Sequence, residues 1–121
     1  MILVTGVCGF VGNHVARALQ RHGQPVRALV RKTSRLDQAA DLDLELAYGD
    51  LRDPASLEAA VKGCEMVFHV AADYRFDVSN PQEVYKSNVE GTVNLLKAAG
   101  NVGAKRIVYT STVGCIDFTP D

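Results

Sequence analysis

The sequence predicts an α/β fold in which five parallel strands form a doubly wound sheet with helices on both faces. Two observations favour it. Short runs of apolar residues alternate along the whole chain with stretches of helical periodicity. A glycine-rich run separates the first apolar run from the first helical stretch, as in a βαβ unit. No repeat, low-complexity stretch or linker divides the 121 residues, so we expect a single domain over residues 1–121.

The first βαβ unit carries the strongest signal. A strand is predicted over Ile2–Thr5, a helix from the glycine run to Gly23, and a second strand over Val26–Val30. The loop residues that we expect at a bound phosphate are Gly6, Gly9, Phe10, Val11 and Gly12. Glycine allows a tight turn and a close backbone approach, and the free N–H groups at a helix start attract an anion. The arrangement predicts a site for the pyrophosphate of a dinucleotide, and the alternative is a simple turn and helix cap.

The remaining elements follow in the same alternation. Strands are predicted over Leu44–Tyr48, residues 66–71 and residues 106–111, and helices over residues 54–62 and 81–99. Asp53 and the proline after it are typical of a helix start. Residues 34–41 form either a short helix or a loop. The helix residues predicted to lie in the core are Leu57, Val61, Val84, Val89, Leu95 and Leu96.

Composition excludes several classes of function. The hydrophobic content of 47%, the charged content of 22% and the net charge of −1 are typical of a globular domain and show no polyanion-binding surface, so we expect no nucleic-acid partner. No run approaches the ~20 apolar residues of a membrane span, and we expect a cytoplasmic protein. The three cysteines lack metal-ligand spacing, so we expect no metal and free thiols. Cys8 either lies beside the cofactor phosphates or fills the loop.

Five motifs, in this order along the chain, resemble those of the extended short-chain dehydrogenase/reductases. They are Val4-Thr5-Gly6-x-x-Gly9-Phe10-Val11-Gly12, Gly49-Asp50-Leu51-Arg52-Asp53, His69-Val70-Ala71-Ala72, Asn88-Val89-Glu90-Gly91-Thr92 and Tyr109-Thr110-Ser111-Thr112. This group includes nucleotide-sugar epimerases and dehydratases and the dihydroflavonol-reductase-like enzymes. Within the group, residues 68–76 and the segment from Tyr85 are most similar to the hopanoid-associated sugar epimerases. The resemblance implies a Rossmann-type sheet with strand order 3-2-1-4-5.

The end of the second strand predicts the choice of cofactor. A carboxylate at this position accepts hydrogen bonds from the ribose hydroxyls of NAD, whereas the 2′-phosphate of NADP requires a cation. Arg31 and Lys32 stand here with no acidic residue, which favours NADP(H) and leaves NAD as the alternative. Solvated basic residues at a strand exit are the other interpretation.

The resemblance carries further cofactor contacts onto this chain. Asp50 and Leu51 match the pair that meets the adenine, and the alternative for Asp50 is a loop carboxylate bonded to nearby backbone without a ligand. Small side chains leave room for the inner ribose and phosphates at Val70, Ala71 and Ala72. Asn88 resembles the family's asparagine that organises the active site, with a packing or surface role as the alternative. Asp73 and Tyr74, and with them Arg75, are expected to meet the substrate or to form a polar loop.

Hydroxyl groups at the end of the fifth strand are the candidate catalytic groups. Thr112 aligns best with the family's catalytic Ser/Thr, and Ser111 is second. A hydroxyl here can hydrogen-bond the substrate oxygen during hydride transfer, or it can cap backbone groups at the strand end. His69 is expected to be a packed histidine rather than a catalytic base, because its strand is otherwise apolar.

The Tyr-x-x-x-Lys pair of the family is not found in this chain. None of the four tyrosines has a lysine four residues later. We therefore expect the N-terminal part of a longer enzyme, or a truncated product of one, that is not catalytically competent alone. A dinucleotide-binding redox sensor and an inert, self-associating fragment are the alternatives. Because the helix expected after the fifth strand is missing, apolar faces should be exposed and favour a homo-oligomer.

Overall fold

A computed structural model shows a five-stranded parallel sheet with the order β3-β2-β1-β4-β5. The structure describes residues 1–72 and 79–112. The strands are β1 (Ile2–Thr5), β2 (Val26–Val30), β3 (Leu44–Tyr48), β4 (Met66–His69) and β5 (Arg106–Tyr109). This confirms the predicted strand order, and the bounds of the first three strands are those predicted.

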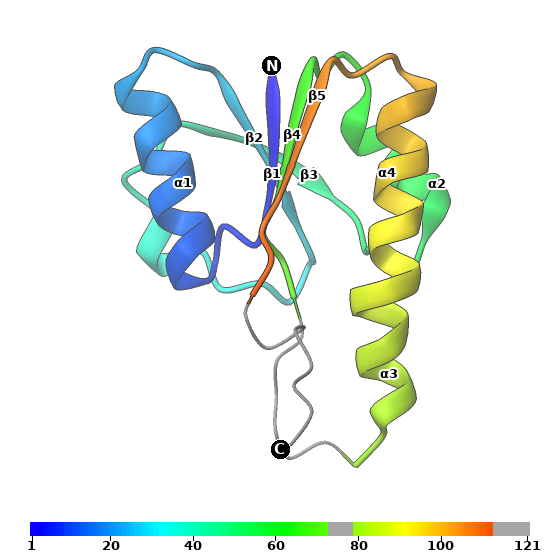
Figure 1. Cartoon of the computed structure of the whole chain (residues 1–121). Helices are drawn as coiled ribbons and strands as arrows, with labels where there is room; N and C mark the ends of the chain where they lie inside the picture. The colour runs from blue at the N-terminus through cyan, green and yellow to red at the C-terminus, as the bar shows by residue number, and fades with distance from the viewer. Residues whose placement is uncertain (73–78, 113–121) are drawn as a thin grey trace, which may run out of the picture.

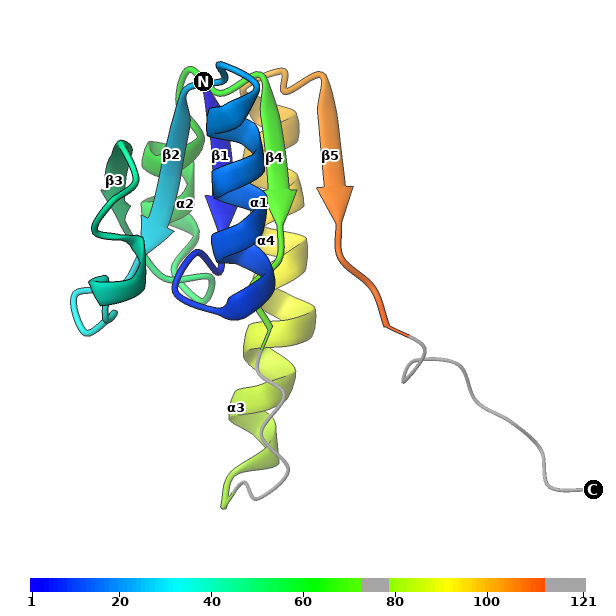
Figure 2. The same ribbon diagram turned by 90° about the vertical axis from the view of Figure 1, so that its left-hand side faces the viewer.

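β1 lies at the centre of the sheet, between β2 and β4. Its residues Ile2 and Thr5 pair with Val26 and Leu29 on one side, and Thr5 pairs with His69 on the other. Figure 2 shows the sheet face-on, with all five strands pointing the same way. The carboxyl ends of the strands therefore lie along one edge, where parallel sheets bind ligands.

Helices cover both faces of the sheet (Figure 1). On one face lies α1 (Phe10–Arg21); on the other lie α2 (Pro54–Val61) and a continuous helical run. That run consists of α3 (Pro81–Tyr85), the π-helical segment η2 (Lys86–Glu90) and α4 (Gly91–Asn101). Its α3 end projects beyond the carboxyl edge of the sheet (Figure 2). For residues 34–41 the sequence left a short helix and a loop as alternatives, and the structure has one short 3-10 turn there, η1 (Asp37–Ala39).

Each face of the sheet has its own apolar core, because alternate strand residues point to opposite faces. Leu3 packs with residues of α2 and α4, whereas Ile2 and Val4 pack with Ala16 of α1. Of the six helix residues predicted to be core, Leu57, Val61 and Leu95 are buried. The described part of the chain contains no helix that is long and apolar enough to span a bilayer.

The predictions were wrong at the ends of two strands. β4 ends at His69 rather than at residue 71, and β5 ends at Tyr109 rather than at residue 111. For β4 the cause lies in β1, which ends at Thr5 because the chain turns at Gly6, where φ is 80°. Beyond that point the backbone N–H groups of Val70 and Ala71 donate to the Thr5 hydroxyl instead of to a strand partner.

The core assignment of Val89 and Leu96 was also wrong, since these side chains are 42% and 39% exposed. α4 buries the stripe of Gly91, Leu95, Ala98 and Ala99. Val89, Val93 and Leu96 follow a second helical stripe, spaced by four and three residues, and all three are exposed. We call these three residues the outer stripe. The helix thus has two apolar faces, and the sequence pattern does not tell which one the sheet covers.

Candidate functional site

The glycine run forms a tight turn between β1 and α1. Gly6 adopts a positive φ, and its carbonyl accepts a hydrogen bond from the N–H of Gly9 at 3.0 Å. A Cβ atom added to Gly12 would lie 2.0 Å from the Gly6 carbonyl oxygen, so only glycine fits there. α1 begins at Phe10 with no acidic residue in its first turn and no side-chain cap. Its positive end is therefore unneutralised and suited to an anion.

A pocket of about 780 Å³ opens above this turn, at the carboxyl edge of the sheet. It is lined by the turn and by residues that follow β2, β3 and β4. The predicted site residues in the lining are Gly6, Gly9, Phe10, Val11, Gly12, Arg31, Asp50, Leu51, Val70, Ala71 and Ala72. The pocket size and the bare helix end fit a bound dinucleotide.

A chain of hydrogen bonds through His69 fixes the backbone that follows β4 in the site. The Thr5 hydroxyl accepts the N–H groups of Val70 and Ala71, each at 3.0 Å, and lies 2.8 Å from His69 Nδ1. His69 Nε2 lies 2.9 Å from the Thr92 hydroxyl, which donates to the Asn88 carbonyl at 2.7 Å. These donors and acceptors are satisfied together by a neutral His69 with its proton on Nε2.

His69 is only 1% exposed, and burial lowers its pKa to about 4. Its ring stacks on Tyr109 of β5, with ring centroids 5.4 Å apart. The structure confirms that it is a packed histidine. Its effect on the site is indirect: the Thr5 hydroxyl holds Ala71 so close to the turn that a Cβ on Gly6 would lie 2.8 Å from the Ala71 nitrogen.

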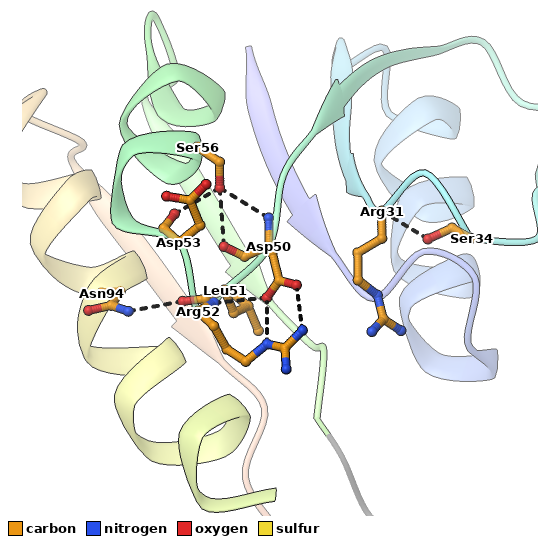
Figure 3. Close-up of polar contacts among 8 residues, drawn as sticks. All are labelled: Arg31, Ser34, Asp50, Leu51, Arg52, Asp53, Ser56 and Asn94. Atoms are coloured by element: carbon orange, nitrogen blue, oxygen red, sulfur yellow. Dashed lines mark hydrogen bonds and ion pairs between the residues drawn. The ribbon is translucent and has the colours of Figure 1, made fainter. Parts of the chain in front are cut away.

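At the end of β2, Arg31 starts a short turn that ends at Ser34. The Ser34 N–H donates to the Arg31 carbonyl, and the Ser34 hydroxyl accepts from the Arg31 N–H, both at 2.9 Å. Both residues line the pocket, and the Arg31 side chain extends away from the turn (Figure 3). Lys32 is exposed and is not in the lining. The structure thus separates the two basic residues that the sequence offered as a pair.

The loop after β3 is fixed by polar contacts on several sides (Figure 3). The Asp50 N–H donates to the Ser56 hydroxyl at 3.0 Å, and the Asn94 amide donates to the Leu51 carbonyl at 3.0 Å. The Asp50 carboxylate accepts two hydrogen bonds from the Arg52 guanidinium. This pairing holds the pKa of the Asp50 carboxyl below its usual value. Asp50 is thus an ionised, prepositioned acceptor at the pocket wall.

Asp53 is the N-cap residue of α2, but its side chain makes no capping hydrogen bond. The Ser56 hydroxyl instead contacts the backbone carbonyls of Asp50 and Asp53, at 3.1 and 2.8 Å. Ser56 therefore ties the loop to the helix start.

Other predicted residues lie outside the lining. Asn88 is half-buried in η2, with its carbonyl bonded to Thr92, while Ser111 and Thr112 are exposed just beyond β5. None of these three lines the pocket, although the neighbouring Ser87 and Thr110 do. Asp73, Tyr74, Arg75 and Cys115 lie outside the described residues.

Sequence reasoning missed several lining residues. They are Thr5, Val7, Leu29, Ser34, Gly49, Ser87 and Thr110. Ser34 was accessible to prediction, because a serine three residues after a strand exit is typical of a turn. Cys8, which the sequence placed either in the loop or near phosphates, is an exposed free thiol in the lining. Among residues 1–72 and 79–112, no group of three or more histidine, cysteine or acidic side chains could hold a metal ion.

Solved structures of other proteins share the fold of this chain. The protein described as gox2253 superposes with a TM-score of 0.90 at 49% identity, over 98% of this chain and 36% of that one. A short-chain dehydrogenase/reductase superfamily protein from Agrobacterium tumefaciens, solved with bound NAD, gives a TM-score of 0.80 at 34% identity over 93% and 33%. The Thermus thermophilus UDP-glucose 4-epimerase, solved in complex with NAD, gives 0.81 at 31% identity over 92% and 37%.

Sequence comparison agrees. A putative dihydroflavonol 4-reductase of Synechocystis is 43% identical over 118 residues, which are 98% of this chain and 34% of that protein. This chain thus spans about a third of the length of the relatives it matches. The model of the NAD dependent epimerase/dehydratase family matches residues 2–117. The chain therefore belongs to this family, which is part of the short-chain dehydrogenase/reductase superfamily.

Proposed function

We propose that this chain is the NADP(H)-binding domain of an oxidoreductase or epimerase that transfers hydride at a secondary alcohol or ketone. One observation carries the proposal. The glycine turn, the end of β2 with Arg31 and the end of β3 with Asp50 meet in a single pocket at the carboxyl edge of the sheet. In open parallel sheets this edge is where dinucleotides bind.

The lining suggests how each part of the cofactor is held. The pyrophosphate would lie against the N–H groups at the start of α1, from Gly9 to Gly12. The adenine would lie against Asp50 and Leu51, and Ala71 and Ala72 would lie beside the inner ribose. These roles are supported by the pocket and by the family, several of whose solved members hold NAD.

NADP(H) is favoured over NAD(H) by the charge at the end of β2. Arg31 lines the pocket, and no acidic residue from Arg31 to Leu36 offers a carboxylate for the ribose hydroxyls. A guanidinium binds a phosphate with strong, directed hydrogen bonds. Lys32 lies outside the lining, and we assign it only a weak, screened attraction.

For the chemical step, we propose Thr112, and secondly Ser111, as hydroxyls that hydrogen-bond the substrate oxygen. The bound nicotinamide supplies or accepts the hydride. Asn88 would help to organise this region, and Asp73 and Tyr74 would meet a sugar-nucleotide or dihydroflavonol-like substrate. Because this chain holds no Tyr-x-x-x-Lys pair, we expect no turnover from it alone.

The test is a pair of matched substitutions, each followed by calorimetric titration with NADPH and with NADH. Arg31→Gln removes a positive charge from the pocket lining, and Lys32→Gln removes the positive charge of the next residue, which lies outside the lining. A lost charge-assisted hydrogen bond costs about 1.5–3 kcal/mol. We therefore expect Arg31→Gln to weaken NADPH by roughly ten- to a hundredfold.

NADH should change by less than about twofold in Arg31→Gln, because it lacks the phosphate. Lys32→Gln should leave both affinities nearly unchanged. Equal losses of NADPH and NADH in Arg31→Gln would contradict the assignment of the 2′-phosphate to this residue.

A further inference from the structure

The Asp50 carboxylate is engaged by a residue that dinucleotide binding does not itself require. Arg52 donates from Nε to Oδ1 at 3.1 Å and from Nη2 to Oδ2 at 2.9 Å, and its backbone N–H donates to Oδ1 at 2.9 Å. Figure 3 shows the Arg52 side chain folded back beneath the carboxylate. Such a two-pronged pair is the strongest geometry that arginine and a carboxylate form.

The carboxylate of this pair stands in the same pocket as Arg31, whereas Arg52 itself is outside the lining. Asp50 and Arg31 both line it, and the positive charge of Arg31 contributes to the low pKa of the Asp50 carboxyl. A 2′-phosphate held by Arg31 carries about −1.5 to −2 charges at neutral pH. An uncompensated carboxylate across the pocket would repel that phosphate.

We propose that Arg52 is a specificity-determining residue, which neutralises Asp50 and so lets one pocket hold both an acidic adenine partner and a 2′-phosphate. The proposal rests on the proposed function, since it concerns how that same pocket distinguishes NADPH from NADH. Arg52 acts through Asp50 and touches no reacting group.

The loop geometry makes this compensation necessary. Asp50 is anchored through its backbone by the Ser56 hydroxyl, and Leu51 is anchored by Asn94. A Cβ on Gly91 would lie 2.8 Å from Leu51 Cβ, so the helical run also packs closely against the loop. If the Arg52 side chain were removed, the fixed loop would leave the carboxylate in place with the backbone N–H of residue 52 as a partner but without the guanidinium charge.

The experiment compares the ratio of NADPH to NADH affinity in four forms of this chain: wild type, Arg52→Gln, Asp50→Asn and the double variant. We expect Arg52→Gln to lower the ratio roughly fivefold, because the Asp50 carboxylate would then repel the 2′-phosphate without a compensating guanidinium. The double variant removes both charges and should return the ratio to within about twofold of wild type. Loss of adenine contacts affects both nucleotides and cancels in the ratio.

Two controls isolate the charge effect. Arg21→Gln removes the same charge at the far end of α1, outside the pocket, and should leave the ratio unchanged. Arg52→Lys retains the positive charge and should preserve most of the ratio. At high salt the effect of Arg52→Gln should shrink, because a screened charge repels less.

The outcomes separate the possible failures. If Arg52 itself bound the phosphate, the double variant would stay as low as Arg52→Gln, and the proposal would be overturned. It would also be overturned by an unchanged ratio in Arg52→Gln, with the wild type still binding NADPH through Arg31. Wild-type protein that bound neither nucleotide would defeat the proposed function, and this inference with it.

Discussion

His69 links β1, β4 and the helical run through a single buried side chain. Thr5 and Thr92 each contact one ring nitrogen, so both nitrogens of the neutral ring are satisfied. A protonated ring would present a second donor to Thr5, whose hydroxyl would then have to give up its own donor role. The neutral form is therefore favoured by burial and by the hydrogen-bond pattern alike.

This neutrality predicts how stability depends on pH. The pKa of His69 is about 4 in the folded chain, below the ordinary value of 6.5, so the unfolded chain binds more protons between these values. Stability is full above pH 6.5 and falls as the pH drops toward 4. We expect a loss of about 2 kcal/mol between pH 7.5 and pH 5. Denaturant unfolding at several pH values measures it.

Substitution of histidines provides the control. His69→Gln, which cannot titrate, should flatten the pH dependence, whereas His14→Gln should preserve it. The low pKa of the Asp50 carboxyl affects stability only as the pH falls below about 3.8. A slope that persisted unchanged in His69→Gln would show that another group titrates in this window.

At the scale of elements, Arg27 of β2 closes the carboxyl end of α2. Its Nη1 donates to the carbonyls of Ala60 and Lys62, both at 2.7 Å, and its Nε donates to Glu45 of β3 at 2.7 Å. The last carbonyls of a helix have no partner within the helix, and this guanidinium supplies one. One side chain thereby joins two strands to a helix.

We expect Arg27→Met to destabilise the fold by about 2–3 kcal/mol, because it leaves the part-buried Ala60 carbonyl unpaired and removes the bond to the exposed Lys62 carbonyl. Glu45→Gln removes only the charge of the partner, whose side chain is 52% exposed, and should cost less than about 1 kcal/mol. Chemical denaturation of the two variants checks the difference. Equal losses of stability in the two variants would show that the ion pair with Glu45, rather than the hydrogen bonds to the end of α2, provides the stabilisation.

The elements also show what sequence patterns determine. Three strands were predicted at their observed bounds, because apolar runs bounded by turn residues mark the length of a strand. The end of β4 was placed too late, since the Thr5 hydroxyl takes over as partner where β1 stops, and β5 ends opposite the last residue of β4. No local pattern reveals a partner 65 residues away.

The candidate site was predictable to a similar degree. The glycine turn, Arg31 and Asp50 could be found because each follows a predicted strand. The role of Arg52 could not, since its contact with Asp50 depends on side-chain directions in a loop. Likewise, Arg31 and Lys32 are equivalent in sequence, and only the turn to Ser34 separates them. The finer resemblance to hopanoid-associated sugar epimerases stays a prediction.

At the scale of the whole molecule, the outer stripe of Val89, Val93 and Leu96 is exposed on the helical run. On β5, Val108 and Tyr109 are exposed as well. Exposed apolar side chains of this kind favour association in water. Self-association of this chain stays a prediction, and the residues expected to mediate it are the outer stripe, Val108 and Tyr109.

We expect this chain to form dimers or larger species whose average mass rises with concentration, as measured by sedimentation velocity. Val93→Lys should shift the equilibrium toward the monomer, because it places a charge in the outer stripe. Val102→Lys is the matched control, since Val102 is similarly exposed but stands outside the stripe. A monomer at all concentrations would show that the stripe is tolerated in water.

The proposed pocket at the carboxyl edge binds a nicotinamide dinucleotide with a preference for the 2′-phosphate. Its most direct test is a calorimetric titration of this 121-residue chain with NADPH and with NADH under one buffer and salt condition. We expect the chain to bind both nucleotides, with NADPH at least about tenfold tighter. Tighter binding of NADH, or binding of neither, would contradict this expectation.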